Sequence, residues 1–327
     1  MEKVVKVLSI DGGGMRGVIP AMVIAEIERL TGKPAYGLFD LIVGTSTGGI
    51  LGACLVTPAE DGSPKYSGKK IVRLYEEEGP KIFSNSLWHR ILSGGSTVDA
   101  KYPPDGADGV FTNLYGELRL TDTLTQVMFP SFELEMGVPY FFKSSDAKKD
   151  PTKNFLLRQA VMATTAAPTY FKPYVIESSD LTLLKHLVFV DGGVVANNPA
   201  MCAYVEAKSM FPDAEEYMLV SIGTGNFAAK QLYEDSKRWG AAQWVNPLLK
   251  ILLTGAIDTV DHQLKVLHAT PADKLNHYYR FQLPITGGEG ALDDASETGL
   301  HKLELMAENL IRDEHHGLDA AAELLVK

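Results

Sequence analysis

The sequence has little cysteine and no excess of basic charge, and each feature excludes a class of protein. Its 327 residues include only Cys54 and Cys202, without a C-x-x-C pair. We therefore expect two reduced thiols and no disulfide framework. Asp and Glu number 41 against 31 Lys and Arg, which gives a formal net charge of −10. Because nucleic-acid binding needs clustered Lys and Arg, we expect no nucleic-acid partner.

Long hydrophobic runs are also missing. The first residues, MEKVVKVLSIDGGG, contain no apolar leader with a small-residue cleavage site, so no signal peptide is expected. Residues 41–59 carry no charge, but their middle reads GTSTGG, which is too polar and glycine-rich for a membrane span. We interpret that stretch as a buried strand, a tight turn and a buried helix. A cytoplasmic protein is expected.

Short apolar runs alternate with helical patterns along the chain. The expected strands are KVLSI, DLIVG, PYFFKSS, HLVFV, EYMLVSIG and YYRFQLP, and the helices between them include TSTGGILGACLV, NFLLRQAVMATTAA and PAMCAYVEAKSM. This alternation indicates an α/β fold with a mostly parallel central sheet covered on both faces. No repeat or linker interrupts the pattern, so residues 1–327 are predicted to form one domain. Residues 226–327 would be its mostly helical C-terminal part.

Glycine-rich turns follow four of the expected strands. DGGGMRG follows KVLSI, TSTGG follows DLIVG, DGG follows HLVFV, and GTG follows EYMLVSI. Ligands collect at the carboxyl ends of parallel strands. We therefore expect these four turns to lie along one edge of the sheet, all facing the same way.

The first turn contains a G-x-G-x-x-G pattern, at Gly12 to Gly17, between a strand and a helix. Such a loop holds an anion on its backbone N–H groups, either a bound phosphate or a transient oxyanion. A dinucleotide site needs an acidic residue at the end of the second strand, whereas Asp40 stands at its start, and no Gly-Lys-Ser/Thr of a P-loop is present. Both facts count against a phosphate. Asp11 is interpreted as a brace for the loop.

The second turn, Gly44 to Gly48, fits G-x-S-x-G between a strand and a helix. A sharp turn there would push the Ser46 hydroxyl out of the sheet edge, with glycines on both sides keeping the space clear. The helix N-terminus would favour developing negative charge. We expect Ser46 to be a nucleophile; the plainer interpretation is a tight turn with a helix cap.

An acid, and not a histidine, is the candidate base. None of the eight histidines stands in a motif, although an ordinary α/β-hydrolase has the order Ser, Asp, His. Asp191 ends the apolar run HLVFV and precedes two glycines, and Asn198 and Pro199 look like the start of the next helix. The alternative role for Asp191 is that of a turn residue.

DGGGMRG, GTSTG and DGG in that order, together with ATTAAPTYF and VDGGVVANNP, resemble the patatin-like phospholipase family. The motifs lie within residues 7–225, and the remainder is similar only loosely. One departure is FELE at 132–135, where the family would show Tyr-Asp. The resemblance implies a three-layer α/β/α patatin-like fold and a Ser–Asp dyad without a histidine.

Site residues follow from the resemblance by position. It implies that Ser46 is the nucleophile and Asp191 the proton acceptor. The oxyanion hole would be formed by the amides of Gly12, Gly13 and Gly14, with Arg16 holding that corner. The supporting glycines would be Gly17, Gly44, Gly48, Gly192 and Gly193. No metal or other cofactor is expected.

The activity that the resemblance implies is a lipid acyl hydrolase of the phospholipase A type, which cleaves fatty acyl esters of membrane glycerolipids during transient contact with a membrane. The alternatives are an acyltransferase or small-ester esterase with the same dyad and, from another class, a nucleotide-binding or regulatory protein without hydrolysis. Some bacterial members are cytosolic effectors switched on by a cyclic nucleotide, which leaves room for such an activator and for a role in antiviral defence. The sequence does not define the lipid headgroup, the ester position or the oligomeric state.

Two stretches stand apart from the motifs. Residues 84–110 are rich in Gly, Pro, Ser and Asp and predict a long loop. Residues 236–266 are apolar with helical spacing and contain two of the three tryptophans. An ordinary core helix is favoured there, and the alternative is a hydrophobic wall or lid over an acyl-chain site. From Glu297 onward the chain is predicted to be helical and mostly solvated.

Overall fold

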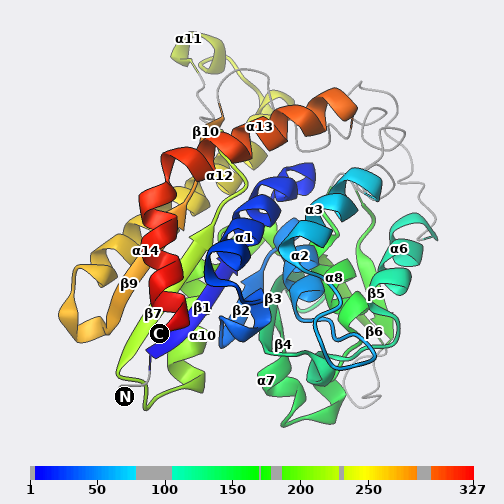
Figure 1. Cartoon of the computed structure of the whole chain (residues 1–327). Helices are drawn as coiled ribbons and strands as arrows, with labels where there is room; N and C mark the ends of the chain where they lie inside the picture. Colours follow the sequence, from blue (N-terminus) through cyan, green and yellow to red (C-terminus); the bar gives the residue numbers. More distant parts are fainter. Residues whose placement is uncertain (1–3, 79–104, 169–170, 178–185, 228–231, 286–295) are drawn as a thin grey trace.

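A central sheet organises the computed structural model, which describes residues 4–78, 105–168, 171–177, 186–227, 232–285 and 296–327 (Figure 1). Within these ranges the sheet has eight strands in the order β5-β6-β3-β2-β1-β7-β9, with β4 paired to β3. The strands are β1 (Val4–Ile10), β2 (Leu41–Gly44), β3 (Gln126–Glu133), β4 (Val138–Lys143), β5 (Tyr174–Glu177), β6 (His186–Asp191), β7 (Glu216–Ile222) and β9 (Leu275–Phe281). Two short strands, β8 (Asn226–Phe227) and β10 (Pro284–Ile285), pair separately.

The strands at the centre of the sheet are parallel and are buried on both faces. β1 pairs in parallel with β2 and with β7. Val5 and Val7 of β1 face one hydrophobic cluster, whereas Leu8 and Ile10 face the other, and all four are buried. A strand covered on both sides carries a nearly continuous apolar run, as β1 does.

Helices cover both faces and complete the expected three-layer α/β/α architecture. One face packs against α1 (Val18–Thr31), α2 (Thr47–Leu55), α3 (Gly68–Glu77), α6 (Asp105–Tyr115), α8 (Leu157–Thr165), α13 (Glu297–Asp313) and α14 (His315–Val326). The other packs against α10 (Ala200–Met210) and the C-terminal half of α12 (Ala241–His268). Three short helices, α7 (Ser144–Ala147), α9 (Gly193–Ala196) and α11 (Tyr233–Ser236), occur in connections.

Two strands meet end to end along one edge of β3. Residues 126–128 of β3 pair in parallel with β2, and residues 131–133 of the same strand pair antiparallel with β6. Since β4 occupies the opposite edge of β3, β2 and β6 share an edge and run toward each other. The carboxyl end of β6, at Asp191, therefore arrives beside the carboxyl end of β2.

This arrangement corrects the expectation that all four glycine-rich turns follow strands of one direction. The turns after β1, β2 and β7 do lie at one end of parallel strands, but β6 approaches from the other side. The sequence pattern also failed to predict β3, the strand with which both β2 and β6 pair. Pro130 lies inside it, and proline ordinarily argues against a strand within a sheet.

The outlying stretches fit their predictions only in part. Most of the predicted loop at 84–110 lies outside the described residues, and its last residues, from Asp105, are helical in α6 rather than a loop. The apolar stretch 236–266 mostly forms α12. Its C-terminal half buries Ile257 and Leu264, whereas Leu248 and Leu252 nearer the N-terminus are exposed. It is a core helix over only part of its length.

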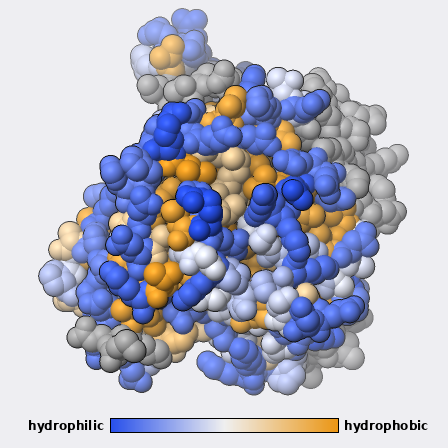
Figure 2. Space-filling view, viewed as in Figure 1, coloured by the Kyte–Doolittle hydropathy of each residue, from blue (hydrophilic) through white to orange (hydrophobic). Residues whose placement is uncertain are grey.

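The last two helices are largely exposed, as predicted, but each buries one apolar face. α13 and α14 both lie against α1, burying residues that include Leu303, Leu310, Leu318 and Leu325. Figure 2 shows the outer side of this layer, where hydrophilic residues predominate and hydrophobic ones show between the helices. In the described part of the chain, none of the helices combines the length and hydropathy that crossing a membrane requires.

Burial of β1 on both faces leads to a prediction about stability. Leu8→Ala should lower the free energy of unfolding by about 3 kcal/mol, because it removes a fully buried side chain from a strand packed on both sides. The measurement is the shift of the urea denaturation midpoint. Leu232→Ala removes the same atoms from a side chain that is 69% exposed and should change the midpoint little. Equal shifts in the two variants would contradict this account of the core.

Candidate active site

Ser46 occupies a strained turn between β2 and α2. Its backbone angles are φ 54° and ψ −122°, a left-handed conformation that side-chain-bearing residues rarely adopt. The turn is tight enough that a Cβ added at Gly44 would overlap the Gly48 carbonyl, and one added at Gly48 would overlap the Ile10 carbonyl. Both glycines of G-x-S-x-G are therefore required by close backbone approach.

Neighbouring hydroxyls hold the turn in place. The Ser46 amide donates to Thr164 Oγ1 at 3.1 Å, and the Thr164 hydroxyl donates in turn to the Pro130 carbonyl. Thr45 Oγ1 donates to the Ala196 carbonyl at 2.6 Å. The strained conformation is thus fixed from α8, β3 and α9 together.

Asp191 lies within hydrogen-bond distance of Ser46. Its Oδ2 accepts from Ser46 Oγ at 2.7 Å, and its Oδ1 accepts from the Gly193 amide at 2.6 Å. The residue is only 5% exposed. Burial raises the pKa of the Asp191 carboxyl to about 6, against the weaker downward effect of the bonds from Gly193 and Ser46. The carboxylate is therefore ionised at neutral pH and more basic than an ordinary Asp.

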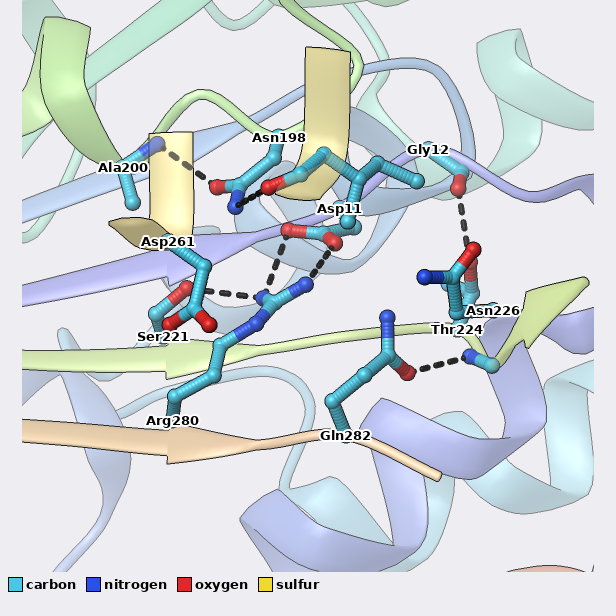
Figure 3. A network of polar contacts seen from close by, with 12 residues as sticks. Asp11, Gly12, Asn198, Ala200, Ser221, Thr224, Asn226, Asp261, Arg280 and Gln282 are labelled. Atoms are coloured by element: carbon cyan, nitrogen blue, oxygen red, sulfur yellow. Dashed lines mark hydrogen bonds and ion pairs between the residues drawn. The ribbon is translucent and has the colours of Figure 1, made fainter. Parts of the chain in front are cut away.

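The glycine loop lies directly against the serine. A Cβ at Gly12 would come within 3.3 Å of Ser46 Cβ. The Gly12 amide donates to the Asn197 carbonyl at 2.9 Å, and the Gly12 carbonyl accepts from Thr224 Oγ1 at 2.6 Å (Figure 3). Within the described residues, no acceptor is hydrogen-bonded to the amides of Gly13 or Gly14. Of the three amides expected to face an oxyanion, that of Gly12 is already engaged.

Arg16 braces the end of the glycine loop. Its Nε donates to the Gly13 carbonyl at 3.3 Å and its Nη1 to the Gly225 carbonyl at 3.0 Å. Burial lowers the pKa of Arg16 to about 10, so the guanidinium stays charged at neutral pH. The other predicted glycines border the same site: Gly17 precedes α1, and Gly192 and Gly193 lead from Asp191 into α9.

Sequence reasoning did not assign the residues that surround the Ser46–Asp191 hydrogen bond. Thr164, Asn197 and Thr224 all lie in stretches that were singled out as motifs, but nothing in their spacing shows which atom they contact. Among the described residues, no histidine hydrogen-bonds Ser46 or Asp191, and no group of three or more His, Cys, Asp or Glu side chains could hold a metal ion. Pro199, and not Asn198 as expected, is the N-cap residue of α10, although Asn198 Oδ1 accepts from the Ala200 amide at 3.0 Å.

Comparison with known proteins shows which family the chain resembles. The model of the patatin-like phospholipase family matches residues 8–204. Patatin-like protein 2 of Oryza sativa subsp. indica is 33% identical, with 94% of this chain and 84% of that protein covered. Patatin-like protein 4 of Arabidopsis thaliana is 31% identical, with 94% and 83% covered.

Patatin-T5 of Solanum tuberosum is also 31% identical, over 95% of this chain and 85% of that protein. Among solved structures, human GIVD cytosolic phospholipase A2 superposes with a TM-score of 0.47 at 9% identity, covering 99% of this chain and 60% of that one. On the strength of the family model and the sequence relatives, the chain belongs to the patatin-like phospholipase family.

Proposed function

We propose that this protein is a lipid acyl hydrolase that cleaves fatty acyl esters of membrane glycerolipids through a Ser46 acyl-enzyme, with Asp191 as the general base. Membership of the family supports lipid acyl hydrolysis in general. The observation that carries the specific proposal is the 2.7 Å hydrogen bond from Ser46 Oγ to a buried carboxylate. A nucleophile within reach of its base is the geometric requirement for this chemistry.

In the first half of the reaction, Asp191 Oδ2 takes the proton from Ser46 Oγ as that oxygen attacks the ester carbonyl carbon. The resulting tetrahedral oxyanion collapses and expels the lysolipid alcohol, which takes the proton back from Asp191. Ser46 is left carrying the fatty acyl group. The raised pKa of Asp191 supports this role, because a base whose pKa lies nearer to neutrality transfers protons more effectively.

The oxyanion would be held by the glycine loop. The amides of Gly13 and Gly14 are the proposed donors, since the Gly12 amide is engaged by Asn197. The N-terminus of α2, which starts directly after Ser46, adds a favourable dipole. Fixed donors of this kind stabilise the transition state more than the ground state.

In the second half, water attacks the acyl carbon while Asp191 accepts its proton. The new tetrahedral intermediate expels Ser46 Oγ, which recovers the proton, and the fatty acid is released. The substrate class is supported by apolar surface next to the base. Val194 and Val195, which follow Asp191 on α9, are 43% and 36% exposed and could contact an acyl chain.

Labelling with a fluorophosphonate tests the dyad. The reagent should attach to Ser46 of the wild-type protein, as located by mass spectrometry, and Ser46→Ala should abolish labelling. Asp191→Asn should lower kcat for a soluble ester by about 10²- to 10⁴-fold, because the proton acceptor is lost.

Ser63 and Asp61 provide a matched control. They form another Ser–Asp hydrogen bond, at 2.6 Å, in an exposed turn. Ser63→Ala and Asp61→Asn should leave labelling and kcat at wild-type values. Labelling at another serine, or near-normal turnover in Asp191→Asn, would refute the dyad.

The raised pKa of Asp191 predicts the pH dependence of the reaction. The base must be ionised to accept a proton, so kcat/KM for an uncharged ester should rise about tenfold per pH unit below about 6 and level off above it. The rate of fluorophosphonate labelling should follow the same curve. Circular dichroism over the same range separates titration of the base from unfolding. A flat profile through pH 6, or a rate that falls as the pH rises through it, would contradict the assignment.

A further inference from the structure

A buried ion pair connects the start of the glycine loop to β9, far away in the sequence. Arg280 Nη2 lies 2.5 Å from Asp11 Oδ2, and Arg280 Nη1 donates to Asp11 Oδ1 at 3.0 Å (Figure 3). The side chains are 7% and 0% exposed, respectively. Arg280 Nη1 also donates to Ser221 Oγ at 2.8 Å, which ties the pair to β7. Asp11 immediately precedes Gly12, so this pair determines where the loop begins.

A second connection reaches the loop from the residue that directly follows β9. Gln282 stands two residues after Arg280, and its Oε1 accepts from the Gly225 amide at 2.8 Å. The Gly225 carbonyl in turn accepts from Arg16 Nη1, and Arg16 Nε holds the Gly13 carbonyl. Arg280 on β9 thus contacts Asp11 on one side of the loop, and Gln282, just after β9, contacts Gly225, which Arg16 links to the other side.

The energetics of buried charge argue for a role beyond stability. Removing two charges from water is unfavourable, and a buried ion pair often stabilises a fold no more than well-packed apolar side chains would. A planar guanidinium that grips a carboxylate with two parallel bonds does fix orientation closely. Here the guanidinium holds Asp11, the residue next to the glycine loop that lies against Ser46.

We infer that Arg280 is a positioning residue, which holds Asp11 so that the amides of Gly13 and Gly14 are set against the oxyanion formed at Ser46. The inference rests on the proposed function. It gives the C-terminal part of the chain, beyond the residues 8–204 that the family model matches, a share in the active site. Oxyanion donors must be placed to within a fraction of an ångström, and misplacement by about 1 Å can lower the rate by about 10²-fold.

The test is the double variant Asp11→Asn/Arg280→Met. Each single variant leaves one buried charge unpaired and should unfold at a lower urea concentration, whereas the double variant removes both charges and should recover much of the midpoint. If the pair positions the loop, kcat for a soluble ester should stay about 10²-fold below wild type, with KM nearly unchanged. The rate of Ser46 phosphonylation should fall in parallel. The midpoint of the pH profile should remain near 6, because Asp191 is untouched.

A matched pair controls for the loss of an ion pair as such. Lys143 Nζ lies 3.2 Å from Glu206 Oε2, linking β4 to α10 with both side chains partly buried. Lys143→Met/Glu206→Gln should keep the wild-type kcat and labelling rate. A second variant, Arg280→Lys, retains the charge but loses the planar fork. It should keep the fold and lower kcat by roughly tenfold, which tests the inference even if the double variant unfolds.

The outcomes separate the two proposals. If the wild type is labelled at Ser46, but Arg280→Lys and the folded double variant react at the wild-type rate, the positioning role is overturned and the dyad stands. A shift of the pH midpoint with no loss of plateau rate would also overturn it, since that result would assign Arg280 to the electrostatics of the base. If the wild type neither hydrolyses esters nor reacts with the fluorophosphonate, the proposed function fails and the positioning role fails with it.

Discussion

The hydrogen bond between Ser46 and Asp191 depends on two strands approaching each other head to head. β2 and β6 pair with successive parts of the same edge of β3, one parallel and the other antiparallel. Their carboxyl ends meet, and the residues that follow them come within hydrogen-bond distance. In an all-parallel sheet, Asp191 would lie beside Ser46 at the end of a neighbouring strand. Here β6 runs toward β2 from the opposite direction, so Asp191 faces the end of β2.

The turn that carries Ser46 depends on close approach of backbone segments. Gly44 and Gly48 let the turn pack onto itself and onto β1, so that Ser46 is held in its strained conformation. Thr164, on α8, then accepts from the Ser46 amide and donates to the Pro130 carbonyl of β3. Because several elements hold the turn, the strain persists in the folded state, and the Ser46 hydroxyl is hydrogen-bonded to Asp191.

Buried charge is concentrated around the same point. Asp11, Arg16, Asp191 and Arg280 are all nearly inaccessible to water. Desolvation raises the pKa of Asp191 and lowers that of Arg16. The same burial that costs folding free energy therefore shifts the proton affinities of the charged groups beside Ser46. Hydrogen bonds from Arg280 to Asp11 and to Ser221 of β7 offset this cost for one pair of the charged groups. The C-terminal part of the chain therefore contacts the start of the glycine loop as well as completing the sheet.

Much about this protein could be read from the order of its residues, because local backbone chemistry determines it. The alternation of apolar runs and helical patterns indicated the layered α/β fold, and the glycines around Ser46 and after Asp191 marked the turns. These signals depend on neighbours in the sequence, such as a strand ending at a glycine. The polar interruption within residues 41–59 likewise argued against a membrane span without any tertiary information.

Only the tertiary structure decided how those turns meet. The antiparallel direction of β6, the role of β3 as the common partner and the engagement of the Gly12 amide by Asn197 depend on contacts between distant segments. Arg280 carried no signal at all, since an arginine in an expected strand looks like any solvated side chain until its partner, 269 positions away, is known. Hydrogen bonds and burial of this kind belong to the assembled sheet, and so no local pattern in the sequence could specify them.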